Sequence, residues 1–148
     1  MRAVIQRVSR ASVSIEGEVV GKIGSGYLIL LGVGHEDTRA EADKLWAKTF
    51  ALRMNDDEDG KTNLSLADVH GEVLVVSQFT LFANCKKGRR PSFTEAAPPA
   101  LATELYEYFV DLARADVDHV ATGQFGANMQ VELVNDGPFT IVLDTDEL

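Results

Sequence analysis

The sequence is poor in the features that mark secreted and membrane proteins. Its 148 residues contain a single cysteine, Cys85, so no disulfide can form within the chain, and this favours a reducing compartment. No apolar run approaches the roughly 20 residues that a membrane-spanning helix needs. The first residues lead directly into a strand-like pattern, without the apolar region of a secretory signal. We therefore expect a cytoplasmic protein that is not attached to a membrane.

Common catalytic signatures are also missing. The three histidines, His35, His70 and His119, stand alone and not at the spacing of metal ligands, and there is no Cys-x-x-Cys pair. Ser77 has no flanking glycines and is not a nucleophile elbow. The spacing therefore indicates no metal, no cofactor and no Ser-His-Asp triad.

Positive charge is scarce and is concentrated in one place. The chain has 14 lysines and arginines against 23 acidic residues, a net charge of −9, which argues against broad nucleic-acid binding. However, the segment 86–90 (Lys-Lys-Gly-Arg-Arg) puts four cations in five residues. Such a patch could hold one strand end or a cluster of phosphates, or it could be an ordinary solvated loop.

Alternating patterns open the chain. Residues 2–8 alternate between apolar and polar, which predicts a half-buried strand, and residues 12–15 predict a second one. The turn residues 16–18 predict a hairpin that returns through residues 19–23. The continuous apolar run 27–33 predicts a central strand that is buried on both faces.

Two helices are predicted. Thr38, followed three residues later by Glu41, has the spacing of a capping box, and the apolar periodicity after it predicts a helix over residues 39–53. A second amphipathic helix is predicted from Leu101 to Leu112, with Pro99 near its first turn.

The remaining segments complete the pattern. Residues 55–60 are expected to form an acidic surface turn, and residues 129–134 and 139–143 two strands joined by a turn at 135–138. The order of strands, helix, strand, helix and strands predicts an α/β class: a single layered domain over residues 1–148, with mixed or antiparallel sheets and two main helices packed on one face.

The most informative stretch is Val73–Leu81. Four apolar β-formers predict a doubly buried strand, which then ends in Ser-Gln-Phe-Thr. An unpaired buried hydroxyl or amide costs roughly 1–3 kcal/mol, so these polar groups are expected at the mouth of the strand. There they line a pocket or simply face water.

Gly137-Pro138 has two interpretations. The simple one is a turn between two strands. However, X-Pro bonds are cis in about 5–6% of cases in folded proteins. A cis bond here would point both carbonyl oxygens the same way and could sort ligands by shape without a side chain.

Two motifs carry a resemblance to a known family. Ser77–Leu81 and Asn135–Thr140 resemble motifs of the D-aminoacyl-tRNA deacylases, the D-tyrosyl-tRNA deacylase family. The resemblance runs nearly the whole chain and includes residues 1–8, 30–33, 90–93 and 122–127. One departure is Phe139, where many members carry a smaller β-branched residue.

The resemblance implies an enzyme that cleaves the ester between a D-amino acid and the 3′-terminal adenosine of tRNA, a proofreading step of translation. Glycyl-tRNA is a further expected substrate, because glycine has no side chain to reject. The resemblance also implies a deacylase-type fold and a homodimer in which a cis Gly137-Pro138 pair reaches into the partner's pocket. The two carbonyls would exclude an L side chain and leave room for hydrogen or a D side chain.

The resemblance and the chemistry together assign roles at the Ser-Gln-Phe-Thr motif. An aminoacyl ester is already reactive, so the demand is orientation and stabilisation of the oxyanion. The N–H groups of Phe79 and Thr80 are expected to form the oxyanion hole, and Gln78 to orient the ester. Thr80 is either a nucleophile, for which no base is evident, or a pocket-shaping residue while the ribose 2′-hydroxyl assists water; we favour the second. The residues assigned to catalysis are Ser77, Gln78, Phe79 and Thr80.

Other residues are assigned to substrate binding. Arg7 is expected to fix the Gly-Pro turn by bonding nearby backbone, and the basic residues 86–90 to contact the tRNA backbone. Phe125, Gly126 and Met129 are expected to line the adenosine or amino-acid site, and Gly137 and Pro138 to bind the substrate in the partner's pocket.

Three alternatives stay open at this stage. A related deacylase with a trans Gly-Pro bond removes a mischarged L-amino acid. A non-catalytic RNA-binding dimer could be built on the same fold, although the acidic composition makes this less natural. The third alternative is an esterase of small molecules.

Overall fold

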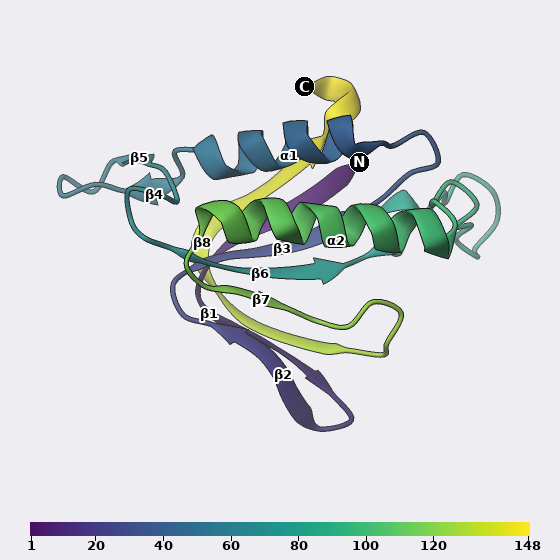
Figure 1. Cartoon of the computed structure of the whole chain (residues 1–148), viewed down its shortest axis with the longest axis horizontal. Coiled ribbons are helices and arrows are strands. Elements are labelled where there is room, and N and C mark those ends of the chain that lie inside the picture. The colour runs from purple at the N-terminus through teal and green to yellow at the C-terminus, as the bar shows by residue number, and fades with distance from the viewer.

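A long first strand organises the sheet (Figure 1). The computed structural model describes all residues, 1–148. The elements are β1 (Arg2–Ile15), β2 (Glu18–Ile23), β3 (Gly26–Gly32), α1 (Arg39–Ala51), β4 (Asn55–Asp56), β5 (Thr62–Leu64), β6 (Glu72–Ser77), the 3₁₀-helix η1 (Phe79–Phe82), α2 (Pro99–Asp116), β7 (Val120–Thr122), β8 (Gln130–Asp144) and the 3₁₀-helix η2 (Thr145–Glu147).

The six-stranded sheet is mixed, as predicted. β1 pairs antiparallel with β8 along one edge, and along the other edge with β3 and then with β2. β3, β6 and β7 are parallel to one another. β4 and β5 form a separate two-stranded sheet. The two helices lie side by side over one face of the main sheet (Figure 1), which confirms the predicted fold class.

The central strands are buried on both faces, as their apolar runs predicted. Successive side chains of a strand point to opposite faces, so Tyr27 and Ile29 pack under the helices while Leu28 packs in a second cluster on the other side. Val75 and Val76 of β6 divide in the same way. The helix-side cluster has 22 buried residues and the other has 8, so most of the core lies between the sheet and the helices.

The helices begin where the sequence predicted. The Thr38 side chain accepts from the Ala40 N–H, and the Glu41 carboxylate accepts from the Thr38 N–H at 2.6 Å, which completes the capping box. α2 begins at Pro99, a residue suited to the first helical position because its missing N–H would have no partner there. The prediction extended the first helix to residue 53, but it ends at Ala51. None of the helices is long and apolar enough to cross a bilayer.

Two predictions of paired short strands were wrong. Residues 2–8 and 12–15 belong to the single strand β1. The first part of this strand pairs with β3 and the last part with β2, and the chain does not turn between them. Residues 129–143 were predicted to form two strands joined by a turn, but β8 runs along β1 from Gln130 to Asp144. The turn-forming residues 135–138 therefore lie within an interrupted strand and do not join a hairpin.

The acidic turn was predicted only in part. Residues 58–60 form an exposed turn, but Asn55 is buried and its amide donates to the Tyr27 hydroxyl at 2.8 Å and to the Leu64 carbonyl at 3.2 Å. A polar side chain inside the core needs such partners. Asn55 thus fixes the two-stranded β4–β5 unit to the main sheet.

Tyr27 gives the fold an alkaline limit. Burial raises the pKa of Tyr27 to about 12, against the opposing influence of the Asn55 hydrogen bond and the Arg7 charge. The raised pKa means that the neutral phenol stabilises the fold fully below pH 10, and that this contribution is lost as the pH rises toward 12. We expect a loss of about 1 kcal/mol from Tyr27 by pH 11.

Urea unfolding of the wild type and of Tyr27→Phe at pH 8 and pH 11 measures this. The variant should be about 1 kcal/mol less stable at pH 8, because the Asn55 hydrogen bond is lost. It should lose less stability than the wild type between the two pH values. Burial also raises the pKa of Tyr106 to about 12, so the variant keeps part of the alkaline loss. Equal losses in both proteins would contradict the assignment.

Candidate active site

The predicted polar segment lies at the carboxyl end of β6. The buried strand ends at Ser77, and the chain turns into the 3₁₀-helix η1. Ser77, Gln78 and Thr80 are half-buried, and the Phe79 side chain is 55% exposed. These side chains are therefore at the mouth of the strand, where the sequence placed them.

The sequence makes room for this turn. A Cβ atom added to Gly32 at the end of β3 would lie 3.0 Å from the Gln78 carbonyl oxygen and 3.1 Å from the Leu81 Cβ. Arg2 secures η1 from the other side: its guanidinium donates to the Leu81 carbonyl at 3.0 Å and lies 4.4 Å from the centre of the Phe82 ring. Sequence reasoning missed the roles of both residues, because each acts through a segment remote in the chain.

Asp144 completes this support. Its carboxylate accepts from the Arg2 Nε at 3.0 Å. Burial raises the pKa of Asp144, but hydrogen bonds from the Asp146 N–H and from Arg2, together with the Arg2 charge, hold it below its usual range. The pair therefore stays ionised down to acidic pH and keeps Arg2 in place beneath η1.

Gly32→Ala tests whether the position of η1 matters for function. The added methyl group must push the Gln78 backbone by a few tenths of an ångström. We expect about a 10-fold lower kcat and a stability loss of about 1 kcal/mol, because small displacements of catalytic groups are costly. Gly17→Ala is the stability control, since its added Cβ meets no atom within 4 Å but its φ of +82° is strained. Unchanged kcat in Gly32→Ala would show that the position of η1 is not critical.

The geometry of Thr80 bears on its role. Gln78 Nε2 donates a hydrogen bond to Thr80 Oγ1. No histidine or carboxylate bonds this hydroxyl, and an amide N–H cannot accept its proton. The first residues of a helical turn also have N–H groups without intrahelical partners, and Phe79 and Thr80 are those residues of η1. The segment therefore presents hydrogen-bond donors without an activated nucleophile.

Gly137 and Pro138 lie in a bulge of β8. Gln6 of β1 pairs with Thr140, and Val8 pairs with Asn135, so four residues of β8, 136–139, lie opposite Arg7 alone. The peptide bond between Gly137 and Pro138 is cis, and both residues are exposed.

Arg7 holds one side of the bulge. Its side chain is buried and its Nε donates to the Asp136 carbonyl at 3.0 Å, which is the backbone contact expected from the sequence. Its Nη1 donates to the Met54 carbonyl at 2.8 Å and lies 3.3 Å from the Asp56 carboxylate. The guanidinium also lies 4.3 Å from the centre of the Phe139 ring. The large residue at 139 thus adds a cation–π contact to the bulge.

Asn135 holds the other side. Its amide donates to the Arg7 carbonyl at 2.9 Å and to the Phe139 carbonyl at 3.0 Å. One amide therefore joins β1 to both ends of the bulge. Side-chain hydrogen bonds to backbone carbonyls therefore hold the bulge, where the backbone hydrogen bonds between β1 and β8 are interrupted.

The predicted residues of the adenosine or amino-acid site lie in the loop after β7. Because β6 and β7 are parallel neighbours, this loop begins at the same end of the strands as Ser77. The Phe125 ring packs 6.0 Å from that of Tyr106, and Gly126 has a φ of +81°, which favours glycine. Met129 packs against the smaller core cluster.

Gly137 and Pro138 of the same chain do not lie at this end of the strands. They lie beside Arg7, which is in register with Tyr27 and, through it, with Val73, four residues before Ser77. At about 3.3 Å per residue and about 4.8 Å per strand, the two motifs are roughly 20 Å apart along the sheet. One chain therefore holds both motifs but does not join them.

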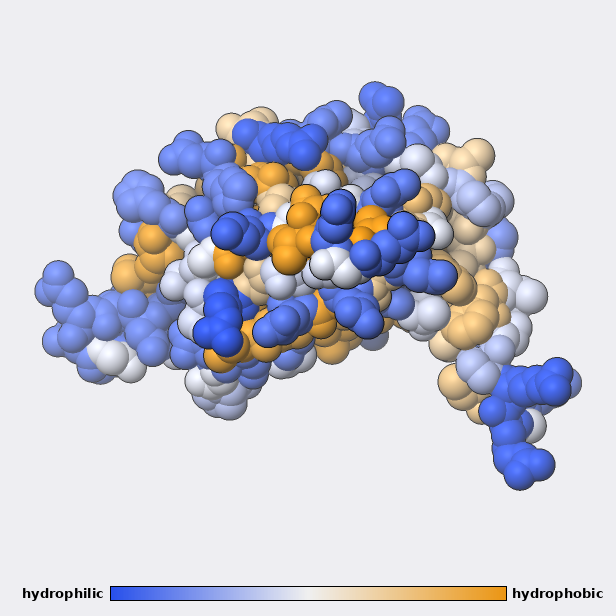
Figure 2. All heavy atoms as spheres, turned by 90° about the horizontal axis from the view of Figure 1, so that it is seen from below, coloured by the Kyte–Doolittle hydropathy of each residue, from blue (hydrophilic) through white to orange (hydrophobic).

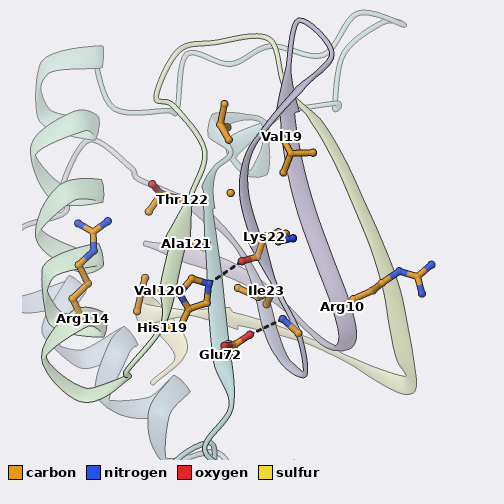
Figure 3. Close-up of a pocket in the computed structure, with 13 residues that line it drawn as sticks. Arg10, Val19, Lys22, Ile23, Glu72, Arg114, His119, Val120, Ala121 and Thr122 are labelled. Atoms are coloured by element: carbon orange, nitrogen blue, oxygen red, sulfur yellow. Dashed lines mark hydrogen bonds between the residues drawn. The ribbon is translucent and has the colours of Figure 1, made fainter.

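The largest hollow of the surface lies elsewhere. It has a volume of about 1040 Å³ and lies between β2 and β7 (Figure 3). Two hydrogen bonds join the strands beside it: one between His119 and the Lys22 carbonyl at 2.9 Å, and one from the Gly24 N–H to the Glu72 carboxylate at 2.6 Å. In Figure 3 Arg10 points away from β7, so the cations around the hollow do not converge. None of the predicted site residues lines it.

Comparison with known proteins identifies the family to which the chain belongs. The family described as D-Tyr-tRNA(Tyr) deacylase matches residues 4–144. A D-aminoacyl-tRNA deacylase of Thermosipho africanus is 55% identical over 148 residues, 100% of this chain and 99% of that protein. One of Chloroflexus aurantiacus is 59% identical over 100% of this chain and 92% of that protein.

Solved structures agree on the fold. A c-Myc DNA unwinding element binding protein superposes with a TM-score of 0.92 at 43% identity, over 97% of this chain and 98% of that one. A probable eukaryotic D-amino acid tRNA deacylase superposes with a TM-score of 0.84 at 16% identity, over 96% and 97%, and so supports the fold alone. The fold and the family match define a hydrolase. The chain belongs to the D-Tyr-tRNA(Tyr) deacylase family.

Proposed function

We propose that this protein hydrolyses the ester bond of D-aminoacyl-tRNA, in the cytoplasm, and releases a free D-amino acid and tRNA. The observation that carries the proposal is the donor-rich segment Ser77–Thr80 at the end of β6, next to the loop after β7. Full-length relatives at 55% and 59% identity carry the name of this activity. Glycyl-tRNA is a second substrate, because glycine presents no side chain to exclude.

Hydrolysis proceeds by attack of water on the ester carbonyl. The N–H groups of Phe79 and Thr80 stabilise the oxyanion, and Gln78 positions the ester and the Thr80 hydroxyl. The ribose 2′-hydroxyl of the substrate assists the water, since no base bonds Thr80. Phe125, Gly126 and Met129 line the adenosine or amino-acid site.

Selection against L-amino acids comes from Gly137 and Pro138 of a second subunit. These residues are exposed, and they lie about 20 Å from Ser77 in their own chain, so a partner chain must supply them. The carbonyl oxygens of the bulge occupy the space that an L side chain would need. A D side chain or a hydrogen atom leaves that space free.

A homodimer built on β8 fits the surface of the chain. β8 pairs with β1 on one edge and has no partner on the other, which leaves a long free edge next to the bulge. Val134 and Val142 of this strand are 39% and 70% exposed. A two-fold dimer would cover these apolar side chains and carry each bulge to the other subunit.

Hydrolysis of matched D- and L-tyrosyl-tRNA by the purified protein, with chelator present, tests the function. We expect rapid release from the D ester only. Release from the L ester would favour the relative that removes L-amino acids. Release from neither, with tRNA still bound in a salt-dependent way, would favour an RNA-binding dimer. Hydrolysis of free aminoacyl esters of small alcohols would favour a small-molecule esterase.

A further inference from the structure

We propose that the exposed aromatic pair Phe79–Phe93 is a stacking surface for the nucleotide that precedes the terminal adenosine of tRNA. The loop 85–91 holds the adjoining phosphates. This inference rests on the proposed function and names the part of the substrate that is recognised outside the reacting ester.

The aromatic pair is exposed where a core residue would be covered. The Phe79 side chain is 55% exposed and the Phe93 side chain 36%. Their ring centres are 5.2 Å apart at an interplanar angle of 77°, so each ring supports the other edge to face. Every nucleobase can stack on such a face, whatever its identity.

The loop 85–91 is held at its base by backbone hydrogen bonds, and the cationic side chains at its tip are exposed. Asn84 and Ser92 exchange two backbone hydrogen bonds, of 2.7 and 2.9 Å, which close the loop immediately before Phe93. A hydrogen bond of 2.6 Å between His35 and the Thr94 carbonyl holds the chain just after it. The aromatic pair is therefore fixed in position beside the loop.

The cations of the loop have no acidic partner. Lys86, Lys87, Arg89 and Arg90 are exposed and form none of the five ion pairs of the chain. They concentrate four of the 14 cationic side chains of an otherwise acidic protein. In Figure 2 a hydrophilic projection stands at the right, where the loop between β6 and α2 extends in Figure 1, with paler apolar side chains at its base. A phosphate backbone complements this charge.

The position of the pair selects the nucleotide. Phe79 lies between Gln78 and Thr80, so its ring borders the place where the ester and the terminal ribose react. The next base along a single strand is the nearest flat group outside that place. Stacking there holds the acceptor end without reading its sequence, which suits an enzyme that acts on many tRNAs.

Phe93→Ala tests the proposal with two substrates. D-tyrosyl-tRNA carries the preceding nucleotide, and the 3′-D-tyrosyl ester of adenosine does not. We expect kcat/KM for the tRNA to fall about 10- to 100-fold and kcat/KM for the adenosine ester to stay within 2-fold. Phe93→Tyr is the matched control, because it keeps the ring and should keep activity on both substrates.

Lys86→Gln/Lys87→Gln tests the phosphate contacts. The slope of log KM for D-tyrosyl-tRNA against log salt should fall by about 1.4, or about 0.7 for each phosphate contact removed. The adenosine ester should show no such change.

Several outcomes would overturn the inference. Equal losses of Phe93→Ala on both substrates would show that Phe93 supports the reacting site itself. Dissociation of the Phe93→Ala dimer in sedimentation would show that the pair packs against the partner subunit. Failure of the wild type to hydrolyse either substrate would instead refute the proposed function, and is seen before any variant is made.

Discussion

Replacing Arg7 with alanine is expected to lower kcat/KM for D-tyrosyl-tRNA at least 100-fold. The buried guanidinium bonds the Asp136 and Met54 carbonyls at 3.0 and 2.8 Å and stacks on Phe139. Alanine removes all of these contacts, so the bulge of β8 loses one of its two supports. In the proposed dimer the carbonyls of Gly137 and Pro138 form a wall of the partner's pocket. Once they move, the D-aminoacyl ester is no longer held in its reactive position, and the L ester is no longer excluded.

The stability of the variant should fall by about 3 kcal/mol. Hydrogen bonds from a charged donor to buried carbonyls contribute roughly 1.5–3 kcal/mol each. The Asp56 and Asp136 side chains are 51% and 59% exposed, so their ion pairs with Arg7 add little. Activity is therefore assayed at a temperature where urea unfolding shows the variant to be fully folded.

Arg7→Lys is the matched control for charge. A lysine keeps the cation but cannot reach two carbonyls at once or stack as a planar group. It should recover stability in part and activity very little. Activity of Arg7→Ala within 3-fold of the wild type would show that the bulge does not need this support.

Gln78→Ala is expected to lower kcat for D-tyrosyl-tRNA about 100-fold, the usual effect of removing one positioned donor. Gln78 donates to Thr80 Oγ1 and lies at the start of η1, so its loss affects both the ester and the adjoining hydroxyl. Gln78→Glu keeps the shape and removes the donor, and should be similarly slow. The fold should be little affected, because Gln78 is only half-buried.

Thr80→Ala separates the two roles of the hydroxyl. If Thr80 shapes the pocket, this variant keeps at least a tenth of the wild-type kcat. Single-turnover kinetics should then show no burst from an acyl-enzyme in either protein. Loss of nearly all turnover in a folded Thr80→Ala protein would identify Thr80 as the nucleophile.

Much of the fold follows from local pattern. The apolar run 27–33 and the apolar start of Val73–Leu81 indicated strands with both faces buried, since nothing polar interrupts them. The capping box at Thr38 and the proline at 99 placed two helix starts correctly. These features are decided within a few residues, and so the sequence is sufficient to predict them.

Other elements depend on remote partners. After Ser77 the chain turns into η1, and this turn depends on the space above Gly32 and on the hydrogen bond from Arg2. The turn residues 135–138 have the chemistry of a hairpin, yet both of their flanks pair with the same strand. The local residues thus determine that the chain bends, and pairing with β1 makes the bend a bulge within one strand and not a hairpin turn.

The residues of the candidate site and their arrangement across two subunits were both expected from the resemblance and not from local pattern. The motifs that contain Ser77 and Pro138 were recognised from resemblance, and the contact of Arg7 with the bulge was expected. No local signal showed that a single chain keeps the two motifs about 20 Å apart. The support from Asn135 and Arg2 was also missed, because each depends on a hydrogen bond between distant strands.

In the proposed dimer, each active site joins Ser77–Thr80 of one subunit to the bulge of the other. Mixing two inactive variants, Gln78→Ala and Arg7→Ala, measures this directly. A mixed dimer has one damaged site and one site with wild-type residues from both subunits. Random exchange should therefore restore about a quarter of the wild-type D-tyrosyl-tRNA hydrolysis. No recovery, with mixed dimers verified by two affinity tags, would place the whole site within one chain and contradict a site shared between subunits.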